Sequence, residues 1–135
     1  MISAECELTV EFNDADPMGV VWNGRYFDYF EIARHAILAR AGVEYADMYR
    51  EGYMLPLVKN SAKYIKPLMP GDRAIVSAVV TEYELMLKMS FTIRKAGTGE
   101  ITTKGESTQF AVNTKGESLG CLPESLVERL RSLDV

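Results

Sequence analysis

Two carboxylates stand close together just before a predicted helix, and they are the residues best placed to do chemistry. Asp14 and Asp16 are separated by one residue, and the helix pattern begins near residue 24. A helix N-terminus offers unpaired backbone N–H groups and partial positive charge, so it can bind a developing oxyanion. A nearby carboxylate can attack a carbonyl carbon or activate water for that attack. The pattern suits acyl transfer to water, but the spacing alone favours a role in turn hydrogen bonds and a helix cap.

No other recognised catalytic or cofactor-binding pattern occurs in the sequence. The only histidine is His35, and the two cysteines, Cys6 and Cys121, lie too far apart in sequence to form a metal-ligand motif. Glycine-rich phosphate loops, Gly-x-Ser-x-Gly elbows and dinucleotide fingerprints are also absent. We therefore expect no metal and no cofactor, with water as the only cosubstrate.

The strand and loop before the helix follow from alternation and from breaker residues. Residues 2–12 alternate apolar and polar side chains, which predicts a half-buried strand. Residues 13–19 are rich in Asn, Asp, Pro and Gly, which predicts a loop. Pro17 disfavours helical backbone angles at Asp16. The predicted loop therefore holds both carboxylates outside regular structure.

A long core-facing helix is the strongest element in the pattern. Residues 24–41 carry apolar side chains at three- and four-residue steps. About 18 residues at roughly 1.5 Å each span roughly 27 Å, which implies a helix lying across a sheet. Asn23 is the expected N-cap, and Gly42 is the expected C-terminal stop.

After residue 53 the pattern predicts four strands in a meander and then a short helix. Turns are expected at 70–72 and 97–99, and Pro123 is expected to open the amphipathic helix. Consecutive hairpins predict an antiparallel sheet with one face free to receive the long helix. One helix covers only one face, so exposed edges and incomplete cover favour oligomerisation. The four strands are expected at 54–66, 74–80, 85–93 and 100–113.

Size and composition predict a single globular domain over residues 1–135, and the order of elements makes it an α+β domain. The net charge of −4 disfavours a nucleic-acid reader. No apolar run is long enough for a signal peptide or a membrane span. Two cysteines are too few for a disulfide framework, and we expect free, buried thiols. A cytoplasmic location with no membrane partner is the resulting expectation.

The loop Asp14-Ala15-Asp16-Pro17-Met18-Gly19-Val20-Val21-Trp22 precedes a helix containing Tyr26-Phe27-Asp28-Tyr29-Phe30-Glu31-Ile32-Ala33-Arg34. This arrangement resembles the 4-hydroxybenzoyl-CoA thioesterase family and related bacterial short-chain acyl-CoA thioesterases. That family has an Asp-x-Asp-x-x-Gly-Val-Val-[Tyr/Trp] loop before a hydrophobic helix rich in Tyr and Phe. The similarity continues through Tyr64-Ile65-Lys66-Pro67-Leu68-Met69-Pro70-Gly71-Asp72 and covers about residues 5–113.

The resemblance implies a hotdog fold, in which a five-stranded antiparallel sheet wraps around one long central helix, here with a short C-terminal helix. It implies a dimer, often paired into a homotetramer, with active sites at subunit interfaces. The implied reaction is hydrolysis of an acyl-CoA to free acid and CoA. Asp16 would be the catalytic carboxylate, either as nucleophile or as general base. The backbone amide of Asn23 would hold the thioester carbonyl oxygen.

Substrate contacts are also implied by the resemblance. Gly19, Trp22 and Tyr26 are the expected substrate-binding residues of the loop and helix, although Trp22 and Tyr26 fit equally well as core. The phosphates of CoA require cations, and Lys63 and Lys88 are the expected partners. Each of these lysines is otherwise an ordinary surface charge.

One departure from the family bears on mechanism. Many bacterial relatives carry a His after the Tyr or Trp, whereas this chain has Asn23, which rules out a histidine acid or base at that position. We expect His35 to be a structural or surface residue. Glu31 is either a supporting carboxylate or a solvated one, and Arg34 either pairs with Glu31 at the i,i+3 spacing or faces the pocket.

Two alternatives to acyl-CoA hydrolysis stay open at this point. An acyl-acyl carrier protein thioesterase would need a basic rim for its acidic partner, and the net charge argues mildly against it. A non-catalytic acyl-CoA binding protein is compatible with the fold, because fold does not determine function. Asp16 argues against that second alternative. A dehydratase is less favoured, because it would need a histidine that this loop lacks.

Overall fold

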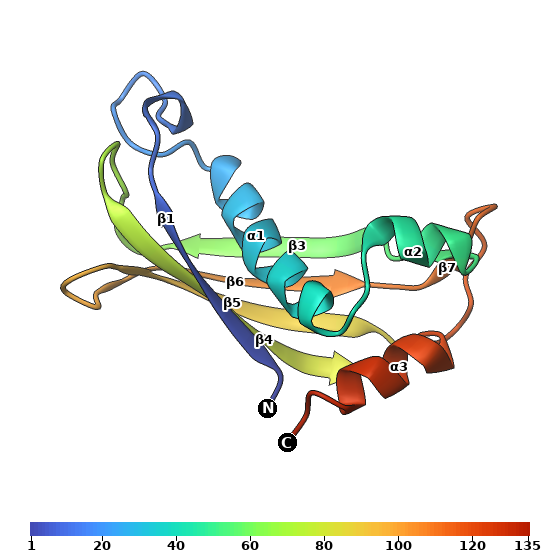
Figure 1. Cartoon of the computed structure of the whole chain (residues 1–135). Helices are drawn as coiled ribbons and strands as arrows, with labels where there is room; N and C mark the ends of the chain where they lie inside the picture. The colour runs from blue at the N-terminus through green and yellow to red at the C-terminus, as the bar shows by residue number, and fades with distance from the viewer.

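A curved antiparallel sheet with one helix lying across its face forms the body of the molecule (Figure 1). The computed structural model describes residues 1–135. The fold is of the α+β class, as expected. In chain order its elements are β1 Ser3–Thr9, η1 Phe12–Asp14, α1 Arg25–Arg40, α2 Tyr45–Arg50, β2 Tyr53–Met54, β3 Leu57–Tyr64, β4 Arg73–Tyr83, β5 Leu87–Lys95, β6 Ile101–Gln109, β7 Val112–Asn113 and α3 Glu124–Arg131.

The sheet order is β1-β4-β5-β6-β3, and it corrects the predicted meander. The hairpins β4–β5 and β5–β6 form as expected, but β3 pairs with β6 rather than with β4. The eight residues 65–72 between β3 and β4 include Pro67 and Pro70, which have no backbone N–H to donate. This connection is longer than a hairpin loop. It therefore crosses the end of the sheet from one edge to the other.

The crossing connection is fixed to the start of the chain and to the loop before α1. The backbone N–H of Val10 donates to the carbonyl oxygen of Asp72 at 2.8 Å, and Gly71 donates back to Val10 at 2.9 Å. Val21 donates to the carbonyl of Leu68 at 2.8 Å. The loop that carries the two aspartates is thus held against the connection from β3 to β4.

Helix α1 has the expected C-terminal stop but not the expected N-cap. Gly42 adopts a φ of +75°, and Val43 donates to Leu38 across the helix end at 2.9 Å, which confirms the stop. Gly24 is the N-cap, so the Asn23 prediction is wrong. The backbone of Gly24 is already helical (φ −67°, ψ −24°), and no side chain caps the first turn.

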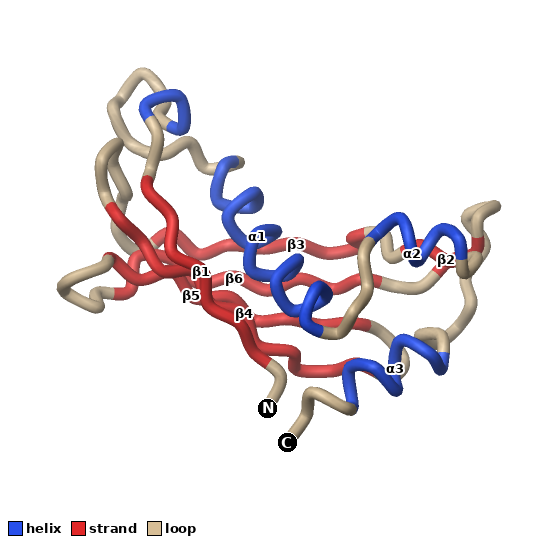
Figure 2. The backbone as a smooth tube through the Cα atoms, viewed as in Figure 1, coloured by secondary structure: helices blue, strands red, loops and turns tan.

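Phe30 anchors α1 to the middle of the sheet. Its ring stacks on the ring of Phe91 in β5, with centroids 4.6 Å apart and planes 13° apart. The same ring lies directly on Gly105 of β6, where a Cβ atom would come within 2.4 Å of it. Only glycine leaves room for this contact, so Phe30 and Gly105 help to fix where α1 lies on the sheet. Figure 2 shows that α1 occupies one face of the sheet while no helix covers the other face.

Some local features depart from the sequence expectations, and others agree with them. Helix α2 was not predicted; a capping box between Glu44 and Asp47 marks its start. Helix α3 begins directly after Pro123, as predicted. Cys6 and Cys121 are both free, as predicted. Cys6 is only half-buried and Cys121 is exposed, so the predicted burial of both thiols is wrong. No helix in the structure combines the length and the apolar character needed to cross a bilayer.

Candidate active site

The loop before α1 folds back on itself through backbone contacts. Ala15 and Val21 form an isolated antiparallel bridge, and the N–H of Asp16 donates to the carbonyl of Val20 at 2.8 Å. Gly19 closes the turn with a φ of +81°, a conformation that favours glycine. The turn returns the chain to the start of the helix. Asp16 lies in the segment before the turn, opposite Val20 in the segment after it.

Asp14 is buried and fully engaged in structural contacts. Its side chain accepts hydrogen bonds from the Tyr29 hydroxyl at 2.8 Å and from the Glu11 backbone N–H at 3.0 Å. Its other oxygen lies 3.1 Å from Nε of Arg25. Burial and this hydrogen bond to Asp14 raise the pKa of Tyr29, so its hydroxyl stays a donor. Asp14 therefore joins the loop to α1 and has no oxygen left for catalysis.

Asp16 is half-buried, and one of its oxygens is free. Oδ1 accepts the backbone N–H of Met18 at 2.8 Å, an Asx turn that fixes the side chain. No donor within the chain binds the second carboxylate oxygen, and no hydrogen bond joins Asp16 to Asn23. Of the two loop aspartates, only Asp16 can offer an oxygen to a ligand.

The start of α1 presents unpaired donors beside this loop. The backbone N–H groups of Asn23 and Gly24 have no acceptor within the chain. The indole of Trp22 lies over Gly24, where a Cβ atom would meet the ring at 2.4 Å. Trp22 is 60% exposed, so the structure excludes its reading as a core residue. An oxyanion bound at this terminus would lie beside the indole ring of Trp22.

A small pocket of about 190 Å³ opens at this helix terminus. Tyr26 is buried and lines it, and its ring packs edge-to-face against Tyr64 at 5.1 Å. Burial, the largest effect, raises the pKa of Tyr26. The hydroxyl of Tyr64 donates to the carbonyl of Asn23 at 2.9 Å. The full lining is Val20, Val21, Asn23, Tyr26, Tyr64, Ile65, Lys66 and Pro67.

The pocket brings some of the predicted site residues together and leaves others apart. Asn23 and Tyr26 line it, whereas Asp16, Gly19 and Trp22 belong to the adjoining loop and turn and not to its lining. Lys63 and Lys88 are exposed on strands and do not line it within one chain.

Sequence reasoning did not assign Tyr64 and Lys66 to the pocket. Both lie in the second stretch that resembles the thioesterase family, and that stretch was the available signal. Lys66 is already paired with Glu100, at 2.7 Å. Tyr64 is therefore the new pocket residue whose polar group reaches the helix start.

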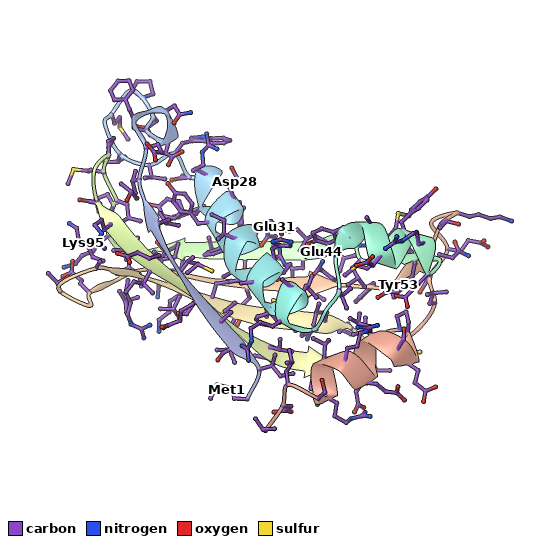
Figure 3. All side chains as sticks on the ribbon, viewed as in Figure 1. Met1, Asp28, Glu31, Glu44, Tyr53 and Lys95 are labelled. Carbon is purple, nitrogen blue, oxygen red and sulfur yellow. The ribbon has the colours of Figure 1, made fainter.

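Glu31 and Arg34 form a structural pair, which decides between the readings left open by the sequence. Arg34 is 1% exposed, contacts Glu31 through Nη1 and lies over the Phe91 ring at 5.4 Å. Glu31 also accepts a hydrogen bond from the hydroxyl of Tyr45 at 2.6 Å, which ties α1 to α2. Figure 3 labels Glu31 on α1 and Glu44 beside α2. His35 is exposed and binds Glu44 at 2.7 Å. None of these residues lines the pocket at the helix start.

A larger apolar cleft of about 560 Å³ lies where α2 meets β2 and β7. It adjoins the first residues of β3, whereas the pocket at the helix start adjoins the last residues of that strand. Seven steps of about 3.4 Å along β3 separate the two by roughly 24 Å. The cleft is lined by Tyr45, Met48, Tyr49, Met54, Leu55, Pro56, Val112 and Gly116.

Comparison with known proteins decides the family. The model of the thioesterase-like superfamily matches residues 10–130. The chain belongs to this superfamily. It is accordingly a thioester hydrolase.

Bacterial proteins are among the relatives of this thioesterase-like protein. A proposed esterase of Synechocystis, sll0410, is 30% identical over 96% of this chain and 79% of its own. A proposed acyl-CoA thioesterase of Bacillus subtilis, YneP, is 28% identical over 79% of this chain and 78% of its own. The crystal structure of the Synechocystis 1,4-dihydroxy-2-naphthoyl-CoA thioesterase Slr0204 superposes with a TM-score of 0.89. At 19% identity over 98% of both chains, that likeness shows a shared hotdog fold.

Proposed function

We propose that this thioesterase-like protein hydrolyses acyl-CoA, with Asp16 as the catalytic carboxylate and the Asn23 backbone N–H as the oxyanion donor. One observation carries the proposal: Asp16 keeps a free carboxylate oxygen in the loop beside a helix start whose N–H groups are unpaired. Asp14, the only competing carboxylate in the loop, is occupied by Tyr29, Glu11 and Arg25.

Two routes satisfy the chemistry, and both begin with the thioester carbonyl oxygen accepting the Asn23 N–H. In the first, Asp16 attacks the carbonyl carbon, the C–S bond breaks and CoA leaves as thiolate. Water then cleaves the resulting mixed anhydride and regenerates the carboxylate. In the second, Asp16 takes a proton from water as that water attacks the carbonyl carbon. The C–S bond then breaks, and the proton passes from Asp16 to the departing thiolate. Both routes end in a free acid and the CoA thiol.

The choice of CoA as the leaving group is supported by the relatives. The Bacillus relative carries the name of an acyl-CoA thioesterase, and the Synechocystis structure is that of a naphthoyl-CoA thioesterase. We also propose a single domain over residues 1–135 and a cytoplasmic location.

A homo-oligomer, either a dimer or a tetramer, is part of the proposal. Within each copy, the curved sheet would wrap around the long helix α1. Strand β3 is a sheet edge with exposed apolar side chains, among them Leu57 and Val58. Exposed edges of this kind are normally covered. A second copy of the chain would cover the edge and place further side chains near the site.

The test is the substitution Asp16→Asn, which keeps shape and removes the charge. We expect turnover of acyl-CoA to fall by at least about a thousandfold, with melting temperature and substrate affinity retained. Asp28→Asn is the matched control, because Asp28 is an exposed carboxylate in the first turn of α1, the helix that follows the Asp16 loop. This variant should keep its turnover. Near wild-type turnover in Asp16→Asn would discard the assignment.

Two other activities are outcomes of the same assay. Matched acyl-CoA and acyl-acyl carrier protein substrates are compared by release of free thiol. Faster thiol release from the acyl-acyl carrier protein would make the carrier protein thioester, rather than acyl-CoA, the substrate. Binding of acyl-CoA without any thiol release would instead show a non-catalytic binding protein.

A further inference from the structure

Strand β3 is the less covered of the two edges of the sheet. It stands last in the strand order, so no strand lies beside one side of its backbone. All of its residues except Ala62 are exposed. The opposite edge, β1, mixes half-buried and exposed residues, and Arg40 of α1 donates to the carbonyl of Ser3 there. The homo-oligomer proposed above would therefore pair through β3.

A two-fold pairing of β3 with a second copy brings opposite ends of the strand together. The commonest homo-oligomers have a two-fold axis and use the same surface of both copies. Two copies of one strand related in this way run antiparallel, so the last residue of one lies beside the first residues of the other. Tyr64, the last residue, lines the pocket at the helix start. Leu57, the first residue, follows Pro56, which lines the apolar cleft beside α2.

Both cavities lie on the inner face of the sheet, which α1 covers, and not on the outer face, which no helix covers. Tyr64 packs against Tyr26 of α1 at the pocket. At the cleft, Tyr45 of α2 donates to Glu31 of α1, and Figure 1 shows α2 on the same side of the sheet as α1. A pairing that continues the inner face from one copy to the next therefore keeps both cavities on one side.

This pairing removes the separation that exists within one chain. Along β3 the pocket and the cleft are roughly 24 Å apart. Neighbouring strands lie only about 5 Å apart, so across the interface the pocket of one copy adjoins the cleft of the other. The two cavities become neighbours only when a second copy is present.

The two cavities suit different parts of one thioester. The pocket at the helix start holds about 190 Å³ and lies at the unpaired N–H of Asn23, which suits the reacting carbonyl. This volume is below the roughly 300–1,000 Å³ typical of a small-molecule site. The cleft holds about 560 Å³, and none of the side chains that line it is charged. Two of them, Met48 and Met54, can adapt to apolar groups of different shape.

We propose that the apolar cleft of one subunit binds the acyl group of a thioester whose carbonyl is held at the helix start of the other subunit. The preferred substrates would then carry an apolar chain of several carbons or an aromatic ring rather than an acetyl group. Each site is incomplete without the second copy. This inference rests on the proposed acyl-CoA hydrolysis and adds which part of the protein recognises the acyl group.

The first test places a charge in the cleft. Tyr49 lines the cleft and is exposed on α2, so the fold should tolerate Tyr49→Glu. We expect kcat/KM for octanoyl-CoA, divided by that for acetyl-CoA, to fall at least about tenfold, because an unpaired carboxylate is costly to bury against an apolar chain. Ala46→Glu is the matched control, because Ala46 is exposed on α2 outside the cleft, and it should keep the ratio. An unchanged ratio in Tyr49→Glu, with melting temperature retained, would overturn the inference.

A mixed oligomer tests whether the cleft acts across the interface. Asp16→Asn chains keep an intact cleft, and Tyr49→Glu chains keep Asp16. The two chains are coexpressed with different affinity tags, and the mixed dimer is isolated through both tags. One of its two sites then combines Asp16 with an intact cleft, so octanoyl-CoA turnover should recover to about half of the wild-type value. No recovery in the mixed dimer would show that the cleft serves its own chain, and full activity in a monomeric wild type would equally overturn the inference.

A binding measurement separates this inference from the proposed function. S-octyl-CoA and S-methyl-CoA are thioethers that cannot be hydrolysed. In calorimetry the octyl compound should bind the wild type at least about tenfold more tightly, because its additional methylene groups are buried. Tyr49→Glu should remove most of that difference. If this pattern holds but acyl-CoA is not hydrolysed, the hydrolase proposal fails and the cleft site stands. If hydrolysis depends on Asp16 but both thioethers bind equally, the hydrolase proposal stands and the cleft site is overturned.

Discussion

The hydroxyl of Tyr64 donates a hydrogen bond to the carbonyl oxygen of Asn23 at 2.9 Å, joining the end of β3 to the start of α1. The two residues are 41 positions apart in sequence. The Asn23 carbonyl belongs to the same planar peptide unit as the Gly24 N–H. The bond therefore fixes the orientation of that unpaired N–H and helps to hold the helix start rigid.

Removing this bond should slow the reaction more than it destabilises the fold. In Tyr64→Phe the aromatic contact with Tyr26 stays, and only the hydroxyl is lost. We expect kcat to fall about tenfold, and unfolding to become easier by about 1 kcal/mol, a typical net value for one hydrogen bond. Steady-state kinetics and urea unfolding measure the two effects. An unchanged kcat would show that the helix start does not depend on Tyr64.

A methyl group at Gly24 should displace the indole of Trp22. The added Cβ would lie 2.4 Å from the ring, and Trp22 is exposed, so the ring can move outward. Trp22 is the only tryptophan, so intrinsic fluorescence reports its displacement directly. We expect a shifted emission maximum in Gly24→Ala and a stability change within about 1 kcal/mol.

The functional effect of that methyl group should depend on the indole. We expect Gly24→Ala to lower kcat/KM in the wild-type background by displacing the Trp22 indole. In the Trp22→Ala background, where the indole is absent, Gly24→Ala should have little further effect. Strictly additive losses in the double variant would contradict the arrangement of Trp22 over Gly24.

Loss of the Tyr29 hydroxyl should destabilise the loop that carries Asp16. Tyr29→Phe removes a donor from the buried Asp14 carboxylate, and a buried acceptor that loses its donor costs about 1–3 kcal/mol. Tyr53→Phe is the matched control, because the Tyr53 hydroxyl is buried without any partner. That control should be neutral or slightly stabilising. Equal destabilisation of both variants would show that the Tyr29–Asp14 bond has no special role.

Stability should fall at alkaline pH because buried tyrosines resist ionisation. Burial raises the pKa of Tyr53 to about 12, with Glu51 adding to the rise and Arg129 opposing it. The folded pKa exceeds the unfolded value of about 10, so the contribution is complete below pH 10 and is lost between about pH 10 and 12. Urea unfolding across this range should show a falling free energy. Tyr53→Phe should reduce the loss by up to about 2 kcal/mol.

The parts of the fold that sequence reasoning predicts are those with local signals. Three- and four-residue apolar steps mark α1, and the glycine turn at 97–99 marks the hairpin between β5 and β6. The acidic loop is likewise visible from its Asp, Pro and Gly residues. These patterns depend only on neighbours in sequence, so one chain suffices to read them.

The place of β3 is not predictable in this way, because strand order depends on partners far along the chain. A strand followed by a proline-rich connection can pair with either neighbour, and here it pairs with β6. The role of Tyr64 follows from that pairing. The register also puts Lys63 and Lys88 on the outer face, away from the pocket at the helix start. The missed N-cap has a local cause, since Gly24 already has helical backbone angles.

The seat of Phe30 on Gly105 restricts how the protein can open. A ring held between a glycine notch and Phe91 cannot slide along the axis of α1 without losing both contacts. Entry of a bulky thioester by translation of the helix is therefore disfavoured. Movement that admits the substrate must come from the turn around Gly19 and from the Trp22 indole over Gly24, while α1 stays in place. Variants selected for larger acyl groups should accordingly change residues of that turn and leave Phe30 and Gly105 intact.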